Sequence, residues 1–193
     1  MKSLPLICGL CCAMLAWGAL QLTAAEPVRS GLQPGEMITA IFEPLNITGE
    51  HAGEPHCLVC ENGLNPVAMV FAREPSERLT KLLAKIDSVA VQNKSLQMGS
   101  FVVFLNDREE LKQQLKDTAK KQSLQQIVLS TMEPSGPEGF EVAKDADVTV
   151  VLYRDFAVQA NHAFRTGELT DEAIDKIVAD LPKILQKYEK KKK

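Results

Sequence analysis

Residues 66–86 read PVAMVFAREPSERLTKLLAKI. The six residues 67–72 form an uninterrupted apolar run between Pro66 and Arg73, which is typical of a strand buried on both faces of a parallel sheet. After Pro75, apolar residues recur at helical spacing as far as Ala90. This periodicity predicts a helix that packs one face against the strand. The stretch therefore predicts a strand–helix unit of an α/β domain.

The same alternation of apolar runs and amphipathic segments continues along the chain. Strands are expected at 37–42, 101–105, 127–129, 148–153 and 156–163, a helix after a cap at Asn106 or Asp107, a helical turn at 140–143, and a last helix from Thr170 with a kink at Pro182. Alternating strands and helices joined by right-handed crossovers give parallel pairing, whereas the last two strands form a hairpin. The fold class expected is α/β, with a central, mostly parallel sheet, an antiparallel edge hairpin, and helices on both faces.

The N-terminus has the pattern of a secretory signal. Lys2 precedes an apolar run from Leu4 to Leu20, and Thr23-Ala24-Ala25 places small residues before a cleavage point at Glu26. A charged start, a short apolar centre and a small-residue exit predict that residues 1–25 are removed on export to the periplasm or the cell exterior. The run is short for a membrane span, so no stable membrane anchor is expected after cleavage.

The composition of the remaining chain indicates its size and the kind of partner to expect. Without residues 1–25, 168 residues remain, with 21 basic and 25 acidic side chains and a net charge of −4. This length suits one domain with its own core. The charge gives no reason to expect nucleic acid as a partner. Only residues 190–193 form a basic run, which fits a solvated chain end. The sequence does not specify an oligomeric state.

Only Cys57 and Cys60 remain after signal cleavage, spaced C-x-x-C. One interpretation is a redox-active dithiol, with Cys57 as the attacking thiol and Cys60 as the resolving one; His56 favours a thiolate and Glu61 opposes it. A second is a zinc knuckle in which His51, His56, Cys57 and Cys60 supply four ligands. A third is a structural disulfide that closes a very short ring. Glu61 stands where a c-type haem motif requires His, which excludes that cofactor.

The element order resembles the thioredoxin fold, in its peroxiredoxin-like and thiol–disulfide oxidoreductase branch. The residues that carry the resemblance are the entry segment Pro34-Gly35-Glu36, the strand 66–72 with its helix near Pro75, the strand 146–153 followed by Asp155, and the closing helix 171–187. Together with the N-terminal pattern and the basic end, the resemblance divides the chain into a signal peptide (1–25), an extended leader (26–36), a thioredoxin-like domain (37–187) and a basic tail (188–193).

The resemblance also implies an activity, thiol–disulfide exchange with protein thiols or disulfides and no organic cofactor. Val148 and Thr149 correspond to the place where the family binds the substrate backbone. Two features depart from the family pattern: the Cys pair lies upstream of the strand, leaving no Cys in residues 73–77, and Val148 stands where thioredoxins have proline. The alternative is a non-catalytic binding scaffold in which the Cys pair is a clip or a metal ligand. A catalytic pair is expected to be exposed and close to residues 73–77.

Overall fold

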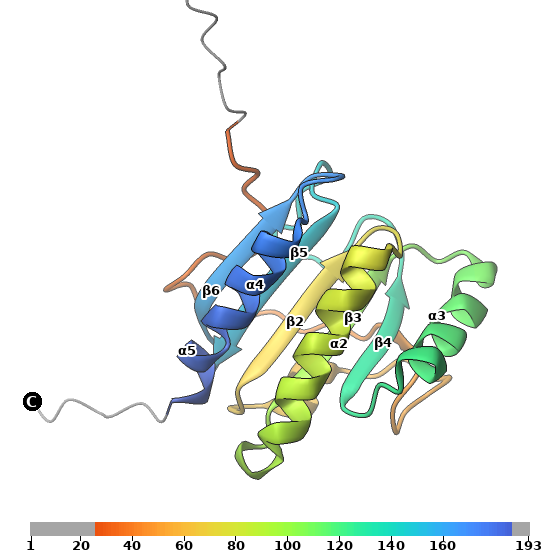
Figure 1. Cartoon of the computed structure of the whole chain (residues 1–193), viewed down its shortest axis with the longest axis horizontal. Helices are drawn as coiled ribbons and strands as arrows, with labels where there is room; N and C mark the ends of the chain where they lie inside the picture. Colours follow the sequence, from red (N-terminus) through yellow and green to blue (C-terminus); the bar gives the residue numbers. More distant parts are fainter. Residues whose placement is uncertain (1–25, 187–193) are drawn as a thin grey trace, which may run out of the picture.

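The apolar run after Pro66 forms strand β2 (Val67–Ala72) inside a six-stranded sheet of order β1-β4-β3-β2-β5-β6 (Figure 1). β2 pairs in parallel with β3 (Gly99–Leu105), which pairs in parallel with β4 (Ile127–Met132). On its other side β2 pairs antiparallel with β5 (Val148–Arg154), which forms a hairpin with β6 (Ala157–Phe164). The expected parallel centre and antiparallel edge hairpin are confirmed.

The computed structural model describes residues 26–186, so the expected signal peptide (1–25) and basic tail (188–193) lie outside the described residues. The helices are α1 (Leu58–Asn62), α2 (Glu77–Gln92), α3 (Glu109–Gln122), α4 (Asp171–Asp180) and α5 (Pro182–Leu185), with a 3-10 turn η1 (Lys94–Leu96). Within the described part of the chain, no helix combines the length and apolar character needed to cross a membrane.

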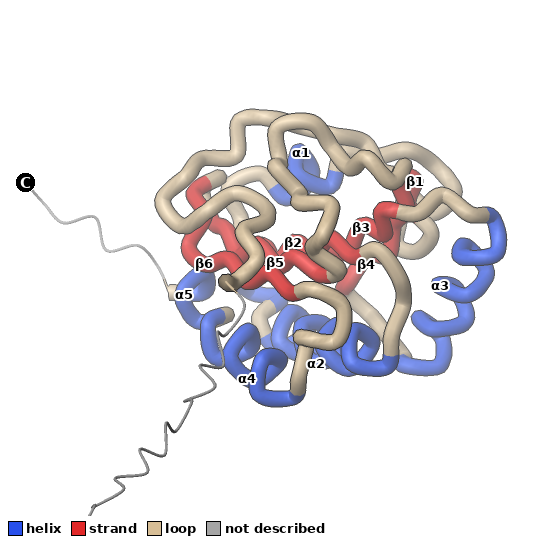
Figure 2. Tube along the Cα trace, turned by 90° about the horizontal axis from the view of Figure 1, so that it is seen from above, coloured by secondary structure: helices blue, strands red, loops and turns tan. Residues whose placement is uncertain are grey.

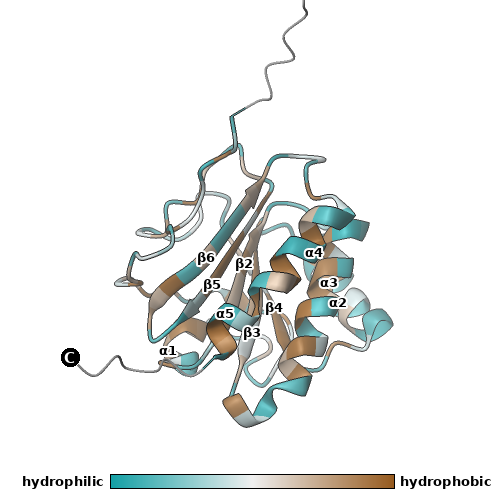
Figure 3. Cartoon of the chain, turned by 60° about the vertical axis from the view of Figure 1, so that its left-hand side comes forward, coloured by the Kyte–Doolittle hydropathy of each residue, from teal (hydrophilic) through white to brown (hydrophobic). Residues whose placement is uncertain are grey.

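Side chains of β2 alternate between two apolar cores, one on each face of the sheet. Ala68, Val70 and Ala72 belong to the core that α2 and α4 cover. Val67, Met69 and Phe71 belong to a second core covered by α1 and by irregular segments, on the opposite side of the sheet (Figure 2). Figure 3 shows helices that carry both apolar and hydrophilic stretches, as a helix packed on a sheet by one face requires. The expectation of helices on both faces is confirmed.

Short polar side chains cap the N-termini of two of the helices, α2 and α4. Ser76 Oγ accepts a hydrogen bond from the N–H of Leu79 at 3.1 Å, and Thr170 Oγ1 accepts one from the N–H of Ala173 at 3.2 Å. Both residues satisfy an N–H that the helix leaves without an internal partner. Pro182 cannot continue the i to i−4 pattern, so the expected last helix divides into α4 and α5.

Three expected features were wrong in detail. Residues 37–42 form no strand, because Ile38 and Phe42 pack into the core under α1 and the segment makes only a bridge from Met37 to Ala157. The strand that pairs with β4 at that edge is β1 (Leu45–Asn46). The N-cap of α3 is Arg108, without a side-chain cap. Residues 140–143 are not helical, and Phe140 packs edge-on against Phe42.

Candidate functional site

Cys57 and Cys60 are joined by a disulfide, with S–S 2.07 Å and Cα–Cα 5.3 Å. Cys57 is the N-cap of α1, and its Sγ accepts a hydrogen bond from the N–H of Cys60 at 3.1 Å. The helix ends after one turn at Gly63, which adopts a positive φ of 51° that favours glycine. The sequence motif therefore folds into a single turn that holds both sulfurs together.

The two cysteines differ in exposure. Cys57 is only 8% exposed and packs in the same core as its neighbours Leu58 and Val59. Cys60, one helical turn further along, is exposed. A partner molecule that approaches the disulfide from solvent therefore meets Cys60 first. The sequence interpretation named Cys57 as the attacking thiol, but the cysteine that solvent reaches is Cys60.

The disulfide lies at the amino ends of the parallel strands. Only four residues separate α1 from β2, and the side chain of Asn62 lies directly over Gly99, the first residue of β3. Residues 73–76, where a thioredoxin-like protein carries its reactive Cys, follow the carboxyl end of β2. At about 3.3 Å per residue, the two ends of a six-residue strand lie roughly 15–20 Å apart. Of the pair, only Cys60 therefore meets the expectation of exposure, and neither cysteine lies close to residues 73–77.

Arg73 fills the carboxyl end of the sheet. Its guanidinium donates to the carbonyl oxygens of Ala146 (3.0 Å), Ala143 (2.9 Å) and Pro134 (3.3 Å). The backbone N–H of Arg73 donates to the carbonyl oxygen of Asp147 (3.0 Å). The Asp147 carboxyl has a raised pKa, first because it is partly buried and second because Glu74 is near. This end holds a polar network without a thiol.

Val148 and Thr149 lie at that same end, because they pair with Ala72 and Phe71 across the sheet. Both are buried, and the Thr149 hydroxyl lies 2.7 Å from that of Ser30 in the leader. The structure therefore brings these two residues together with the leader and not with the Cys pair.

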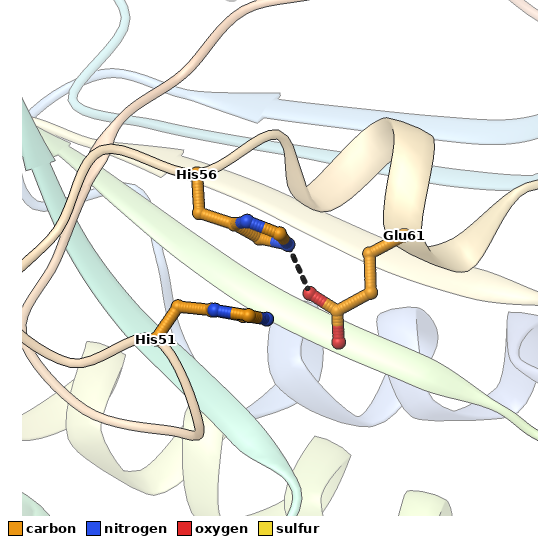
Figure 4. A group of neighbouring side chains, drawn as sticks. All are labelled: His51, His56 and Glu61. Carbon is orange, nitrogen blue, oxygen red and sulfur yellow. Dashed lines mark ion pairs between the residues drawn. The ribbon is translucent and has the colours of Figure 1, made fainter.

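His51 and His56 lie near the disulfide but do not converge on its sulfurs. Their rings stack on each other with centroids 3.6 Å apart, and His56 Nε2 is 3.0 Å from Glu61 Oε2 (Figure 4). The three side chains place possible metal ligands within 4.8 Å of one another. The four-ligand set of two histidines and two cysteines is not assembled, since the sulfurs are bonded to each other. Glu61 was not identified from the sequence as a partner of the two histidines, although Glu61 directly follows Cys60 in the sequence.

The third histidine, His162, pairs with Asp180. Its Nε2 is 3.0 Å from Asp180 Oδ2, and the side chain is 19% exposed. Burial lowers the pKa of His162, and the Asp180 carboxylate opposes that effect. His162 is therefore a satisfied structural residue, distant in the chain from the Cys pair.

Comparisons with known proteins identify the fold. No protein-family model and no curated protein sequence matches the chain. The chain superposes on a candidate protein disulfide isomerase of Bacteroides thetaiotaomicron with a TM-score of 0.61 at 14% identity, covering 83% of this chain and 96% of that one. Peroxidoxin BcpB of Mycobacterium tuberculosis gives 0.54 at 16% identity, with 79% and 98% covered. A secreted Mycobacterium tuberculosis disulfide oxidoreductase homologous to E. coli DsbE gives 0.50 at 11% identity, with 74% and 94% covered.

These neighbours are thioredoxin-like proteins. The described residues therefore adopt a thioredoxin-like fold, as the element order predicted. At these identities the likeness concerns the fold alone, and the chemistry has to be argued from the residues of this chain.

Proposed function

We propose that the protein is an exported thiol–disulfide exchange protein that acts on protein thiols or disulfides through Cys57 and Cys60. The observation that carries this proposal is the asymmetry of the disulfide: Cys60 is exposed, and Cys57 is buried and accepts the Cys60 N–H. An exchange site needs one sulfur that a partner can reach and another that stays in place to leave or to resolve.

The reaction assigns the two sulfurs different roles. A thiolate of the substrate attacks Cys60 Sγ, the Cys57–Cys60 bond breaks, and Cys57 Sγ leaves as a thiolate that still accepts the Cys60 N–H. A second substrate thiolate then attacks the substrate sulfur of the mixed disulfide and releases Cys60. The substrate loses two electrons and two protons and gains a disulfide, and the protein becomes a dithiol. In the reverse direction Cys60 attacks and Cys57 resolves.

Exposed apolar side chains at the same end of the sheet as the disulfide support a protein as the substrate. Leu64 and Met37 are 62% and 51% exposed. The Leu64 carbonyl accepts the N–H of Asp155, and Met37 bridges to Ala157, so both residues adjoin the β5–β6 turn. That turn lies beyond the amino end of β2, the same end as the Cys pair. Two large apolar side chains exposed beside one turn are compatible with contact to a protein surface.

Export is supported by two features. Residues 1–25 have the charge, apolar run and small-residue exit of a secretory signal. A disulfide between the only two cysteines that follow them suits an oxidising compartment, where such bonds persist. One of the structural neighbours is a secreted disulfide oxidoreductase.

A second candidate function is a binding scaffold in which the disulfide is structural. It is favoured by the distance of the pair from the end of the sheet where the fold usually carries its reactive Cys. The two candidates predict different responses to substitution of a single cysteine.

The experiment that separates them is trapping of a mixed disulfide. Cys57→Ser and Cys60→Ser are each mixed with an oxidised model protein, and covalent adducts are measured by intact mass. Under the exchange proposal Cys57→Ser, which keeps the exposed Cys60, forms an adduct rapidly, and Cys60→Ser forms little. Equal, slow labelling of both variants contradicts the proposal and leaves the scaffold.

A further inference from the structure

Two separate segments bring His51, His56 and Glu61 to one point beside the disulfide. His51 lies in the turn after β1, whereas His56 and Glu61 flank Cys57 and Cys60 on either side. Figure 4 shows both imidazole rings extending side by side toward the Glu61 carboxylate. Potential donor atoms of the three residues lie within 4.8 Å of one another.

The turn that carries His51 is fixed at both ends. The Gly53 N–H donates to the Asn46 carbonyl at 2.8 Å, and the Asn46 N–H donates to the Glu54 carbonyl at 3.1 Å. Thr48 Oγ1 accepts the N–H of Leu129, which ties the turn to β4 at 2.9 Å. Gly49 and Gly53 adopt positive φ values of 87° and 98°, which allow the chain to reverse here. The position of His51 over His56 is therefore built into the backbone.

The second fixed point is α1. The His56 N–H donates to the Pro44 carbonyl at 3.1 Å, and the Glu61 N–H donates to the Cys57 carbonyl at 3.0 Å. The disulfide spans the residues between His56 and Glu61, which holds these two side chains at a set separation. Both groups of ligands are thus positioned by rigid elements, as a metal site requires.

His56 lacks the hydrogen bond that its surroundings suggest. Its Nε2 is buried and has no hydrogen-bond partner in residues 26–186, although Glu61 Oε2 is 3.0 Å away. The two groups are close enough for an ion pair, but the contact does not meet the geometry of a hydrogen bond. His162 provides the contrast, because its Nε2 makes an aligned contact with Asp180 at the same 3.0 Å. A cation between the ring nitrogens and the carboxylate would give His56 Nε2 the partner that Glu61 does not supply.

We propose that His51, His56 and Glu61 form a zinc-type metal site, with solvent in the remaining coordination position. Two imidazole nitrogens and one carboxylate oxygen are a ligand set that suits zinc and other borderline transition metals, and not Mg²⁺ or Ca²⁺. Donor atoms around a tetrahedral zinc ion lie roughly 3.3 Å apart, so separations that now extend to 4.8 Å would have to shorten by up to about 1.5 Å through side-chain rotation. The site uses neither sulfur as a ligand, although the closed disulfide helps to position His56 and Glu61.

The test is a Zn²⁺ titration of the oxidised full mature chain, with intact mass used to verify that the disulfide remains closed. We expect one Zn²⁺ per chain by calorimetry and no heat with Mg²⁺. Glu61→Gln and His51→Gln should each weaken binding by at least about tenfold. Glu54→Gln is the matched control, because Glu54 is an exposed acid of the same turn outside the cluster, and it should bind as the unaltered protein does.

Nitrogen-15 spectra of the three histidine rings keep the proposal testable if a variant fails to fold. On addition of Zn²⁺ to the unaltered protein, the ring signals of His51 and His56 should shift together and saturate at one equivalent. The His162 signals should not move. Substoichiometric binding, equal loss of affinity in Glu54→Gln, or a His162 shift as large as the other two would each overturn the proposal.

Discussion

The two ends of the sheet are both polar and both connected by hydrogen bonds, but they differ in what they leave accessible. At the carboxyl end the Arg73 guanidinium donates to three carbonyl oxygens and the Thr149 hydroxyl contacts that of Ser30, so these polar groups have partners. At the amino end Cys60 is exposed and His56 Nε2 has no aligned partner. The fold is thioredoxin-like, yet the Cys pair lies at the end of the sheet opposite to residues 73–77, where the resemblance led us to expect a reactive Cys. A shared fold therefore did not determine where the Cys pair lies.

The largest expected effect is on the rate of dithiol oxidation, which should depend on the amino end of the sheet and not on the carboxyl end. Cys60→Ser should lower the rate of dithiol oxidation by at least about a thousandfold, because the attacked sulfur is removed. Ser76→Ala, at the position where the fold usually carries its reactive Cys, should leave that rate unchanged. Turnover of a dithiol peptide measures both. A loss of rate in Ser76→Ala would show that the carboxyl end takes part in the reaction.

The next effect concerns stability at the carboxyl end. Arg73→Ala should lower the free energy of unfolding by about 2–3 kcal/mol, because carbonyl oxygens at positions 143 and 146 lose their donor. The redox potential of the Cys pair should not change. Denaturant unfolding gives the free energy, and Arg78→Ala, at an exposed arginine of the adjoining helix α2, is the control. A changed redox potential of the Cys pair in Arg73→Ala would show that the carboxyl end of the sheet influences the disulfide at the amino end.

A smaller effect compares one asparagine from each end. Asn62 Nδ2 donates to the Leu58 carbonyl at 2.7 Å within α1, and Asn106 Nδ2 donates to Glu74 Oε1 at 2.8 Å. Replacement of either by Ala should cost about 1 kcal/mol of unfolding free energy. Only Asn62→Ala should lower the exchange rate. The decrease should be roughly fivefold if the whole loss of about 1 kcal/mol acts on the conformation of α1. Equal rates in both variants would mean that the geometry of α1 is not limiting.

The smallest effect is a pH dependence away from both ends. Burial lowers the folded-state pKa of His162 below 6.5, while Asp180 opposes this and Lys183 and Lys176 add to it. The unfolded chain therefore binds more protons here at mildly acid pH. The stabilising contribution is present above pH 6.5 and is lost as the pH falls through 6.5 toward the folded-state pKa. His162→Gln should flatten that part of the stability profile measured by thermal unfolding; an unchanged slope would assign it to other groups.

Much of the fold could be predicted from sequence because its strands are apolar runs with sharp boundaries. β2 matches the expected residues 67–72, since Pro66 and Arg73 limit it on both sides. The failure at 37–42 has a physical reason: Ile38 and Phe42 pack onto the face of the sheet, and local pattern does not say which direction the backbone takes.

The site was harder to predict. The Cys pair and both nearby histidines could be found from spacing and residue type. Their location at the amino end was also readable, because a segment just before a strand lies at that strand's amino end. The exposure of Cys60 depends on a one-turn helix that places Cys57 in the core. The contact of His51 with His56 and Glu61 depends on a turn closed by long-range hydrogen bonds, for which local sequence gives no signal.

The most direct test of exchange chemistry at the amino end is a redox titration of the mature protein, with alkylated Cys57 and Cys60 counted by intact mass. We predict a reversible two-electron transition between about −120 and −270 mV, the range of catalytic dithiols. A disulfide that resists reduction until below roughly −300 mV would contradict the exchange account and identify the pair as a structural clip.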